Sequence, residues 1–283
     1  MLRIGLNLWH RDARRVKEIL EKAASIGINH VEISADYPFG VEELEAFEAM
    51  ARECRERGFT ISVHAPWHEI SLASPIESLR VASVEVCRKV LRNAYRVEAI
   101  YVVLHVTSSQ PACRGRLWEK CVEAGRRSVA ELGEAAEELG VYLAIENVGD
   151  PCCGRIDQFS RVLEPPAYAC IDVAHAYSYE ENPSKAVSEV KMHEMLAKWV
   201  SAVGRDRVLA VHLHGVKARG RKLETHLEIE EGLLDPKAFA KEVSRSARFL
   251  VFEVFKKLDG SEWDVPSIAR VVRELRSWIL VYA

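Results

Sequence analysis

Short apolar segments rich in β-branched residues alternate along the chain with longer segments in which apolar residues recur every three or four positions. The short segments are nearly continuously apolar, which is typical of strands in a parallel sheet that is buried on both faces. Eight segments have this pattern, at residues 2–8, 30–34, 60–64, 99–106, 141–146, 168–172, 208–214 and 249–255. We therefore predict eight buried parallel strands.

The longer segments have the spacing of amphipathic helices, as in RRVKEILEKAASIG and AGRRSVAELGEAAEELG. Gly27, Gly58 and Gly140 stand where C-terminal helix caps are expected, and Pro266 opens the last predicted helix. Alternating strands and helices predict an α/β fold, a (β/α)8 barrel that forms a single domain over residues 1–283. A doubly wound open sheet is the alternative, but no glycine-rich turn follows the first strand, as a dinucleotide-binding fold requires.

Composition narrows the class of protein. The 39 Lys and Arg against 42 Asp and Glu leave a net charge of −3, which argues against non-specific nucleic-acid binding without excluding a local basic groove. No apolar run approaches the length of a membrane span, and early charges interrupt any secretory signal. We expect a cytoplasmic protein without a membrane partner.

Seven cysteines are scattered along the chain, and an odd number without a secretory signal is a poor disulfide framework. Their spacing also lacks the paired motifs of a cysteine-type zinc site. We predict free thiols without a metal at residues 54, 87, 113, 121, 152, 153 and 170.

Most predicted strands end on an ionisable residue. These residues are Glu32, His64, His105, Glu146, Asp172, His212 with His214, and Glu253. Because they recur once per βα unit, their side chains should meet at the carboxyl end of the barrel, where barrel enzymes have their active sites.

Each residue alone has a structural explanation, as a satisfied core histidine or a helix-capping carboxylate. Three carboxylates buried near several imidazoles are costly without a cation, however, and this ligand mix suits zinc, manganese, cobalt or iron. Asp172 with His175, and Glu224 with His226, add two close carboxylate–imidazole pairs. We predict a divalent metal site, Zn²⁺ or Mn²⁺, with one to three ions.

Seven segments resemble the xylose-isomerase-like TIM barrels, which include sugar isomerases and epimerases, inosose dehydratases and the endonuclease IV enzymes. They are VHAPWHEISLASP (63–75), LHVTSS (104–109), AIENVGD (144–150), CIDVAHA (170–176), VHLHG (211–215), THLEIEEGLLD (225–235) and FEVF (252–255). The resemblance implies a (β/α)8 fold with a divalent metal at its carboxyl face.

The epimerase branch holds one metal with two glutamates, an aspartate and a histidine, and the matching residues are Glu146, Asp172, His212 and Glu253. The resemblance implies that the ion polarises a ketose carbonyl while Glu146 and Glu253 act as the catalytic acid and base. His175 resembles a neighbour that contacts substrate oxygens.

The endonuclease IV branch holds three zinc ions and hydrolyses DNA beside an abasic site. Matching residues are His64, His105, Glu146, Asp172, His175, His212, Glu224, His226 and Glu253, with Glu224 where that family usually has Asp. The first strand, RIGLNLWH, lacks that family's Gly-x-His opening, and SADYPFG lacks its long DNA-penetrating loop.

We therefore favour a metal-dependent isomerase or epimerase of a small-molecule sugar or sugar phosphate. An endonuclease IV-like hydrolase of abasic-site DNA is the alternative, and a lyase or dehydratase of a cyclic polyol is a third.

A few further residues are candidates for substrate binding. Trp9 and Trp67 follow strands near the predicted mouth, where they would stack on a sugar or simply pack. Glu32 would orient substrate or pair with a neighbouring base. Lys217 and Arg219 lie in the basic segment KARGRK (217–222), a loop that would bind a phosphate, contact a DNA backbone or remain solvated.

Overall fold

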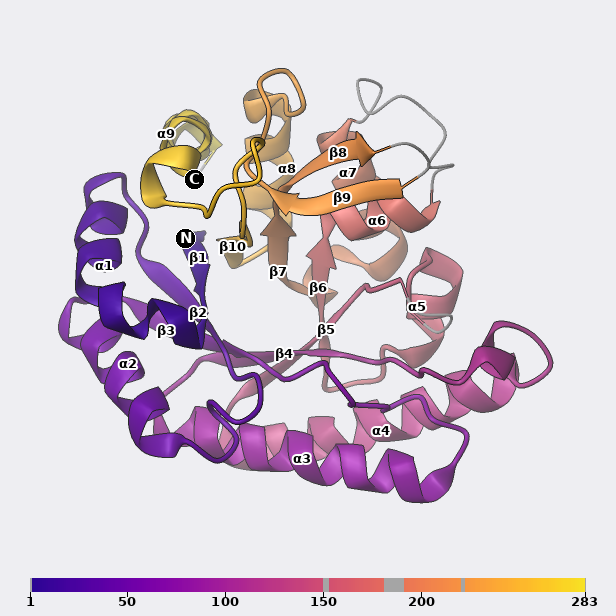
Figure 1. The fold of residues 1–283 in the computed structure, drawn as a ribbon. Coiled ribbons are helices and arrows are strands. Elements are labelled where there is room, and N and C mark those ends of the chain that lie inside the picture. The colour runs from indigo at the N-terminus through magenta and orange to yellow at the C-terminus, as the bar shows by residue number, and fades with distance from the viewer. Residues whose placement is uncertain (1, 150–152, 181–190, 220–221, 283) are drawn as a thin grey trace.

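The computed structural model describes residues 2–149, 153–180, 191–219 and 222–282, so Cys152 and Arg221 lie outside the described residues. Eight parallel strands close into a barrel in the order β1-β10-β7-β6-β5-β4-β3-β2 (Figure 1). The strands are β1 (Arg3–Leu8), β2 (His30–Ser34), β3 (Thr60–His64), β4 (Tyr101–His105), β5 (Tyr142–Glu146), β6 (Tyr168–Asp172), β7 (Val208–Leu213) and β10 (Phe249–Phe252). The predicted (β/α)8 barrel is confirmed.

Helices surround the barrel, with α3 and α4 forming one long side of the molecule (Figure 1). They are α1 (Val16–Ser25), α2 (Leu44–Glu56), α3 (Glu77–Arg96), α4 (Trp118–Leu139), α5 (Ile156–Val162), α6 (Val173–Glu180), α7 (Met192–Val203), α8 (Pro236–Ser246) and α9 (Val265–Tyr282), with short 3₁₀ turns η1 (His10–Arg15), η2 (Pro111–Arg114) and η4 (Arg205–Arg207). None of the described helices is both long enough and apolar enough to cross a membrane.

Helix ends follow the predicted glycine signals. Gly27, Gly58 and Gly140 have φ angles of 92°, 81° and 70°, the left-handed conformation that a residue without Cβ adopts most easily. Pro266 is the second residue of α9, where its missing N–H costs no helical hydrogen bond.

Inside the barrel, a compact apolar layer lies below the carboxyl ends of the strands. It consists of Tyr101, Val103, Ala144, Cys170, Leu209, Ala210 and Phe249, each at most 4 % exposed. A separate and larger apolar core lies between the strands and the surrounding helices. The inner layer is a floor that excludes water from beneath the strand-end residues.

The segment after β7 differs from the prediction of a loop at residues 217–222. It forms an antiparallel hairpin, β8 (Gly215–Arg219) and β9 (Lys222–Leu227), drawn in orange beside α6 and α7 in Figure 1. The segment is too polar for the buried-strand pattern, so apolar content alone missed it. Gly215 permits the turn into the hairpin, because a Cβ there would come within 2.2 Å of the Glu228 carbonyl oxygen.

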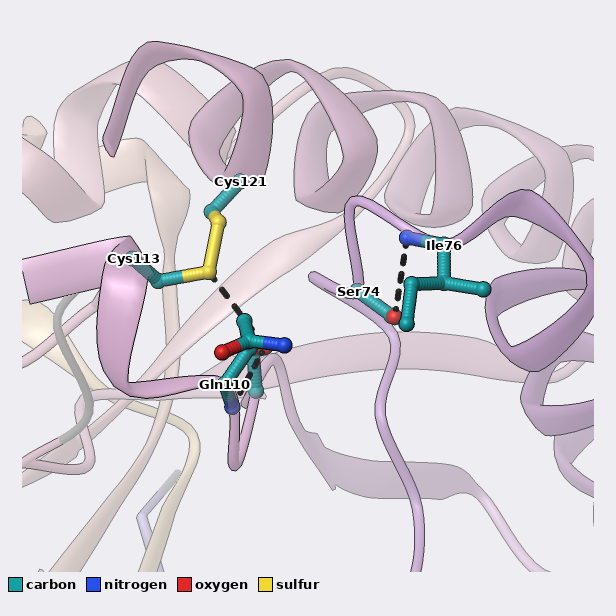
Figure 2. Close-up of a disulfide and its surroundings, with 6 residues drawn as sticks. Ser74, Ile76, Gln110, Cys113 and Cys121 are labelled. Atoms are coloured by element: carbon teal, nitrogen blue, oxygen red, sulfur yellow. Dashed lines mark hydrogen bonds between the residues drawn. A yellow bond between two sulfur atoms is a disulfide. The ribbon is translucent and has the colours of Figure 1, made fainter. Parts of the chain in front are cut away.

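The prediction that all cysteines are free thiols is wrong for one pair. Cys113 in η2 and Cys121 in α4 form a disulfide with a Cα–Cα distance of 5.8 Å, as Figure 2 shows. The 3₁₀ turn folds the chain back onto the first turn of α4, which brings together two residues eight positions apart. Cys54, Cys87, Cys153 and Cys170 are not in disulfides.

Candidate metal centre

The carboxyl ends of the strands bring the predicted ionisable residues to one end of the barrel. His105 lies opposite Glu146 in the β4–β5 register, and Asp172 lies opposite His212 in the β6–β7 register. Because each pair occupies neighbouring parallel strands, both side chains of a pair point to the same side of the sheet. The fold thus assembles the cluster from residues that are far apart in the sequence.

Glu146 is the hub of this cluster. Its Oε2 atom lies 3.2 Å from His64 Nε2, 3.2 Å from His105 Nε2 and 3.4 Å from His212 Nδ1. Its Oε1 atom lies 3.1 Å from His175 Nδ1. One carboxylate that is 1 % exposed therefore faces four imidazoles.

A group of four residues places its ligand atoms within 4.8 Å of one another. It consists of Glu146, Asp172, His212 and Glu253. Asp172 is held firmly on both sides: its backbone N–H donates to Asn147 Oδ1 at 2.7 Å, and its Oδ1 accepts the backbone N–H of His175 at 2.6 Å. All four residues are buried, at 5 % exposure or less.

Two further groups flank the first. His64, His105 and Glu146 form one, and His175, His214 and His226 form the other. His226 has a φ of 59° and donates its backbone N–H to His214 Nδ1 at 2.9 Å, so the hairpin and β7 are tied together at the site. The last group contains His214, which is not among the ligands that the resemblance implies, whereas Glu224, which is among them, belongs to none of the groups found in the described residues.

The carboxylates in the cluster are ionised. Burial alone would raise the pKa of Glu146, but the surrounding imidazoles, His105 and His212 first, hold it well below its usual value. Burial also raises the pKa of Glu253, but the charge and hydrogen bond of His212 outweigh this effect and lower the pKa to about 2. The cluster therefore presents negative charge to a cation.

The pKa values of two imidazoles shift upwards, in the opposite sense to those of the carboxylates. Burial lowers the pKa of His64 and of His175, but nearby carboxylates overcome this and raise each to about 9. Burial and the neighbouring imidazole of His214 lower the pKa of His226 to about 3. Protons on His64 and His175 are the charges that a metal ion would replace.

Several buried donor and acceptor atoms in the cluster lack a hydrogen-bond partner. They are Glu146 Oε1, Asp172 Oδ2, His175 Nδ1, both ring nitrogens of His212, and His214 Nε2. Buried polar atoms are normally satisfied, and these approach one another within ion-pair distance but without hydrogen-bond geometry. Nitrogen and carboxylate oxygen atoms that converge in this way fit a divalent transition-metal ion.

Cys170 shares a potential ligand group with Glu146 and His212, directly across from Glu146 in the β5–β6 register. Burial raises the pKa of its thiol well above the usual value. In the absence of a metal ion the Cys170 thiol is therefore neutral.

A cavity of about 260 Å³ opens above the cluster. Aromatic rings of Trp9, Trp67 and Phe255 form part of its wall, and Glu146, Glu253, His64, His105, His175 and His226 contribute its polar side. Trp9 packs edge-on against Phe255 with ring centroids 5.0 Å apart, while Trp67 is 42 % exposed at the rim. No lysine or arginine of the described chain lines this cavity.

The other predicted substrate-binding residues lie elsewhere. Glu32 is fully buried below the cavity, beside His212, and lies outside its lining. Lys217 is exposed on β8, away from the cavity lining, and Arg219 ends that strand.

Sequence reasoning missed Asp36, which lines the cavity and whose Oδ2 atom is buried without a hydrogen-bond partner. Burial raises its pKa, against the opposing effect of His64. Asp36 lies two residues beyond the end of β2, so the same search for carboxylates just after a strand would have found it.

A closed parallel barrel with this cluster at the carboxyl ends of its strands has the architecture of a barrel enzyme with a metal site. The chain belongs to the xylose isomerase-like TIM barrel family, whose model matches residues 20–279. This confirms the resemblance seen in the sequence.

Relatives within this fold differ in activity. A protein named "Probable endonuclease 4" from Carboxydothermus hydrogenoformans is 23 % identical over 212 residues, which cover 71 % of this chain and 70 % of that protein. The structure of a D-tagatose 3-epimerase-like protein matches with a TM-score of 0.74 and 16 % identity, over 99 % of this chain and 98 % of the other. The 3-keto-D-glucoside 4-epimerase YcjR from E. coli matches with a TM-score of 0.68 and 16 % identity, over 98 % and 100 %.

Proposed function

We propose that the protein is a divalent-metal-dependent enzyme that isomerises or epimerises a sugar or sugar phosphate. The observation that carries this proposal is the position of Glu146 and Glu253. Both are ionised carboxylates, both line the cavity, and both share the four-residue ligand group with Asp172 and His212. Sugar epimerases with the same fold, named above, add support from outside the chain.

The reaction needs a proton to leave and return at carbon. A divalent ion held by the four residues would polarise a carbonyl oxygen of the substrate and offset the negative charge that develops there. One glutamate removes the proton from the adjacent carbon, and the C–H electron pair moves towards the carbonyl oxygen. Isomerisation follows when the same glutamate returns this proton to the neighbouring carbon. Epimerisation follows when the other glutamate takes up a proton from solvent and delivers it to the opposite face of the same carbon.

Side chains around the cavity bind and orient the sugar in this proposal. Trp9 and Trp67 offer aromatic faces for the apolar side of a sugar ring. His175 lines the cavity beside Glu146, where its ring would contact a substrate hydroxyl. The proposed enzyme works in the cytoplasm on a small-molecule substrate.

A second candidate function rests on the two flanking groups. With His64–His105–Glu146 on one side and His175–His214–His226 on the other, the chain offers positions for up to three ions. Three ions would support an endonuclease IV-like hydrolase of abasic-site DNA. The cavity lining favours a sugar, because its described residues supply no lysine or arginine to a DNA backbone.

The deciding experiment measures metal content and turnover on the same preparation. We expect about one divalent ion per chain, and deuterium from D₂O incorporated at a carbon of one sugar in a panel of free and phosphorylated ketoses. Three zinc ions per chain, with clean incision of an abasic-site duplex and no sugar turnover, would establish the hydrolase instead. A dehydrated product from a cyclic polyol would identify a lyase.

A further inference from the structure

A line of buried polar side chains leads from the candidate metal centre down into the barrel. Glu32 on β2 is its central member and is fully buried. Its Oε1 atom lies 3.0 Å from His212 Nε2, and its Oε2 atom accepts a hydrogen bond from Ser62 Oγ at 3.1 Å. A carboxylate in this position needs a physical reason, because it touches neither the cavity nor solvent.

The two ring nitrogens of His212 face different surroundings. Nδ1 lies 3.4 Å from Glu146 Oε2 and 3.3 Å from Glu253 Oε2, so it points into the four-residue ligand group. Nε2 points the other way, towards Glu32. Metal-ligating histidines commonly present their second N–H to a carboxylate, which fixes both the tautomer and the ring orientation.

The side chains next to Glu32 on the side away from His212 favour its ionised form. Ser62 uses its only proton on Glu32, so its oxygen must accept, and His30 Nε2 lies 2.9 Å away. Thr60 Oγ1 lies 2.9 Å from the other ring nitrogen of His30, Nδ1, and donates to the Asn29 carbonyl oxygen at 3.3 Å. Burial lowers the pKa of His30 to about 3, so this ring stays neutral. The hydrogen bonds from His30 to Ser62 and from Ser62 to Glu32 therefore run in one direction and end on the carboxylate.

We propose that Glu32 is a positioning residue of the metal centre. Its carboxylate holds the Nε2 proton of His212, so that the Nδ1 lone pair faces the ion bound by Glu146, Asp172 and Glu253. The inference rests on the metal dependence in the proposed function but on neither candidate substrate. The sequence left two roles open for Glu32, orienting a substrate or pairing with a neighbouring base, and the inference develops the second.

The test measures the affinity of the full-length protein for Zn²⁺ by competition with a chromophoric chelator. Glu32→Gln keeps the shape of the side chain and removes its charge. We expect the Zn²⁺ affinity to fall about 10- to 100-fold, the usual effect of removing such a partner. In the zinc-loaded variant, the ¹⁵N NMR signals of His212 should lose the single tautomer with the proton on Nε2.

Asp12→Asn is the matched control, because Asp12 is also a buried carboxylate, at 3 % exposure, but bonds the backbone N–H of Trp9 instead. Asp12→Asn should leave the Zn²⁺ affinity within about twofold of the wild type. If Glu32 had only a structural role, Glu32→Gln should show the same small change. Wild-type affinity in folded Glu32→Gln would overturn the inference.

If Glu32→Gln does not fold, Ser62→Ala provides the second test. It removes one hydrogen bond to Glu32 and should weaken Zn²⁺ binding by about threefold to tenfold. Unchanged affinity in that variant would overturn the inference as well. A wild-type protein that binds no divalent ion is a different outcome, because it overturns the proposed function itself.

Discussion

Two clusters of buried charge in this protein differ in how completely they satisfy themselves. The first is centred on Arg80, which is 3 % exposed between α3 and α4. Its guanidinium donates to Glu77 through Nε at 3.0 Å and through Nη2 at 2.8 Å, and to Ser128 Oγ at 3.2 Å. Glu131 Oε1 lies 2.8 Å from its Nη1 atom. We call these four residues the Arg80 network.

The second cluster, the candidate metal centre, contains more buried ionisable groups, and fewer of their atoms have hydrogen-bond partners. Its carboxylates and imidazoles approach one another closely, yet buried atoms of Glu146, Asp172 and His212 lack hydrogen-bond partners. In the Arg80 network the glutamate side chains are also 55 % and 36 % exposed, so water helps to stabilise them. Burial of charge alone therefore does not indicate a ligand site. Several buried nitrogen and oxygen atoms that converge without hydrogen-bond partners do indicate one.

Glu146→Gln should have the largest effect, because it removes the one carboxylate that faces four imidazoles. We expect turnover to fall by at least about 10³-fold, since both an acid–base group and a metal ligand are lost. Steady-state kinetics together with metal analysis of the purified variant measure this effect.

Glu131→Gln in the Arg80 network is the control for Glu146→Gln. It should retain turnover within about twofold, because its contact to Arg80 lies outside the cavity. Wild-type turnover in Glu146→Gln would remove Glu146 from the catalytic group and would leave the contrast between the two clusters without functional meaning.

The barrel was predictable because its signal is local. Each buried strand is a short apolar run, and each carboxyl end places its last polar residue at the same end of the barrel, as for Glu146 and Asp172. The hairpin formed by β8 and β9 was missed because its residues alternate and carry charges. The Cys113–Cys121 bond was missed because the predicted compartment argued for reduced thiols.

The detailed roles in the site depend on geometry that spacing along the chain does not contain. Glu32 lies two residues before the end of β2, whereas Glu146 is the last residue of β5, and the Glu32 side chain lies beside His212 and outside the cavity lining. His214 joins His175 and His226 in one group of possible ligands, although it is separated from them along the chain by 39 and 12 residues. Such choices depend on packing across several strands.

Removal of bound metal should have the second-largest effect. A divalent ion that binds the folded state at about 1,000 times its dissociation constant stabilises it by about 4 kcal/mol. Treatment with EDTA should therefore lower the midpoint of thermal unfolding by several degrees, and added Zn²⁺ or Mn²⁺ should restore it. An unchanged midpoint would show that the cluster satisfies itself as the Arg80 network does.

The pH dependence of metal binding should sharpen the contrast further. His64 and His175 have pKa values raised to about 9 without metal, so an ion must displace their protons. Apparent affinity should therefore rise from pH 6 to pH 9, by up to about one decade per pH unit for each proton displaced.

The stability of the metal-free protein should fall over the pH range in which metal affinity rises. A histidine pKa raised from 6.5 to about 9 by folding stabilises the protein fully below pH 6.5, and this stabilisation is lost as the pH rises to 9. The difference between the unfolding midpoints of the loaded and the metal-free protein should widen over that interval. A constant difference between pH 6.5 and pH 9 would contradict the proton displacement.

Arg80→Met should have the smallest effect and tests the other cluster. Methionine retains most of the apolar stem and removes the hydrogen bonds, so we expect a loss of about 1–2 kcal/mol in the free energy of unfolding. The loss stays modest because Glu77 and Glu131 regain water at their exposed ends, and Ser128 still donates to the Leu72 carbonyl at 2.7 Å. Chemical denaturation of the variant, with and without EDTA, should give the same metal-dependent stabilisation as the wild type. A variant that lost this metal-dependent stabilisation would show that the two clusters are coupled through α3 and α4. In that case the Arg80 network would contribute to the geometry of the candidate metal centre.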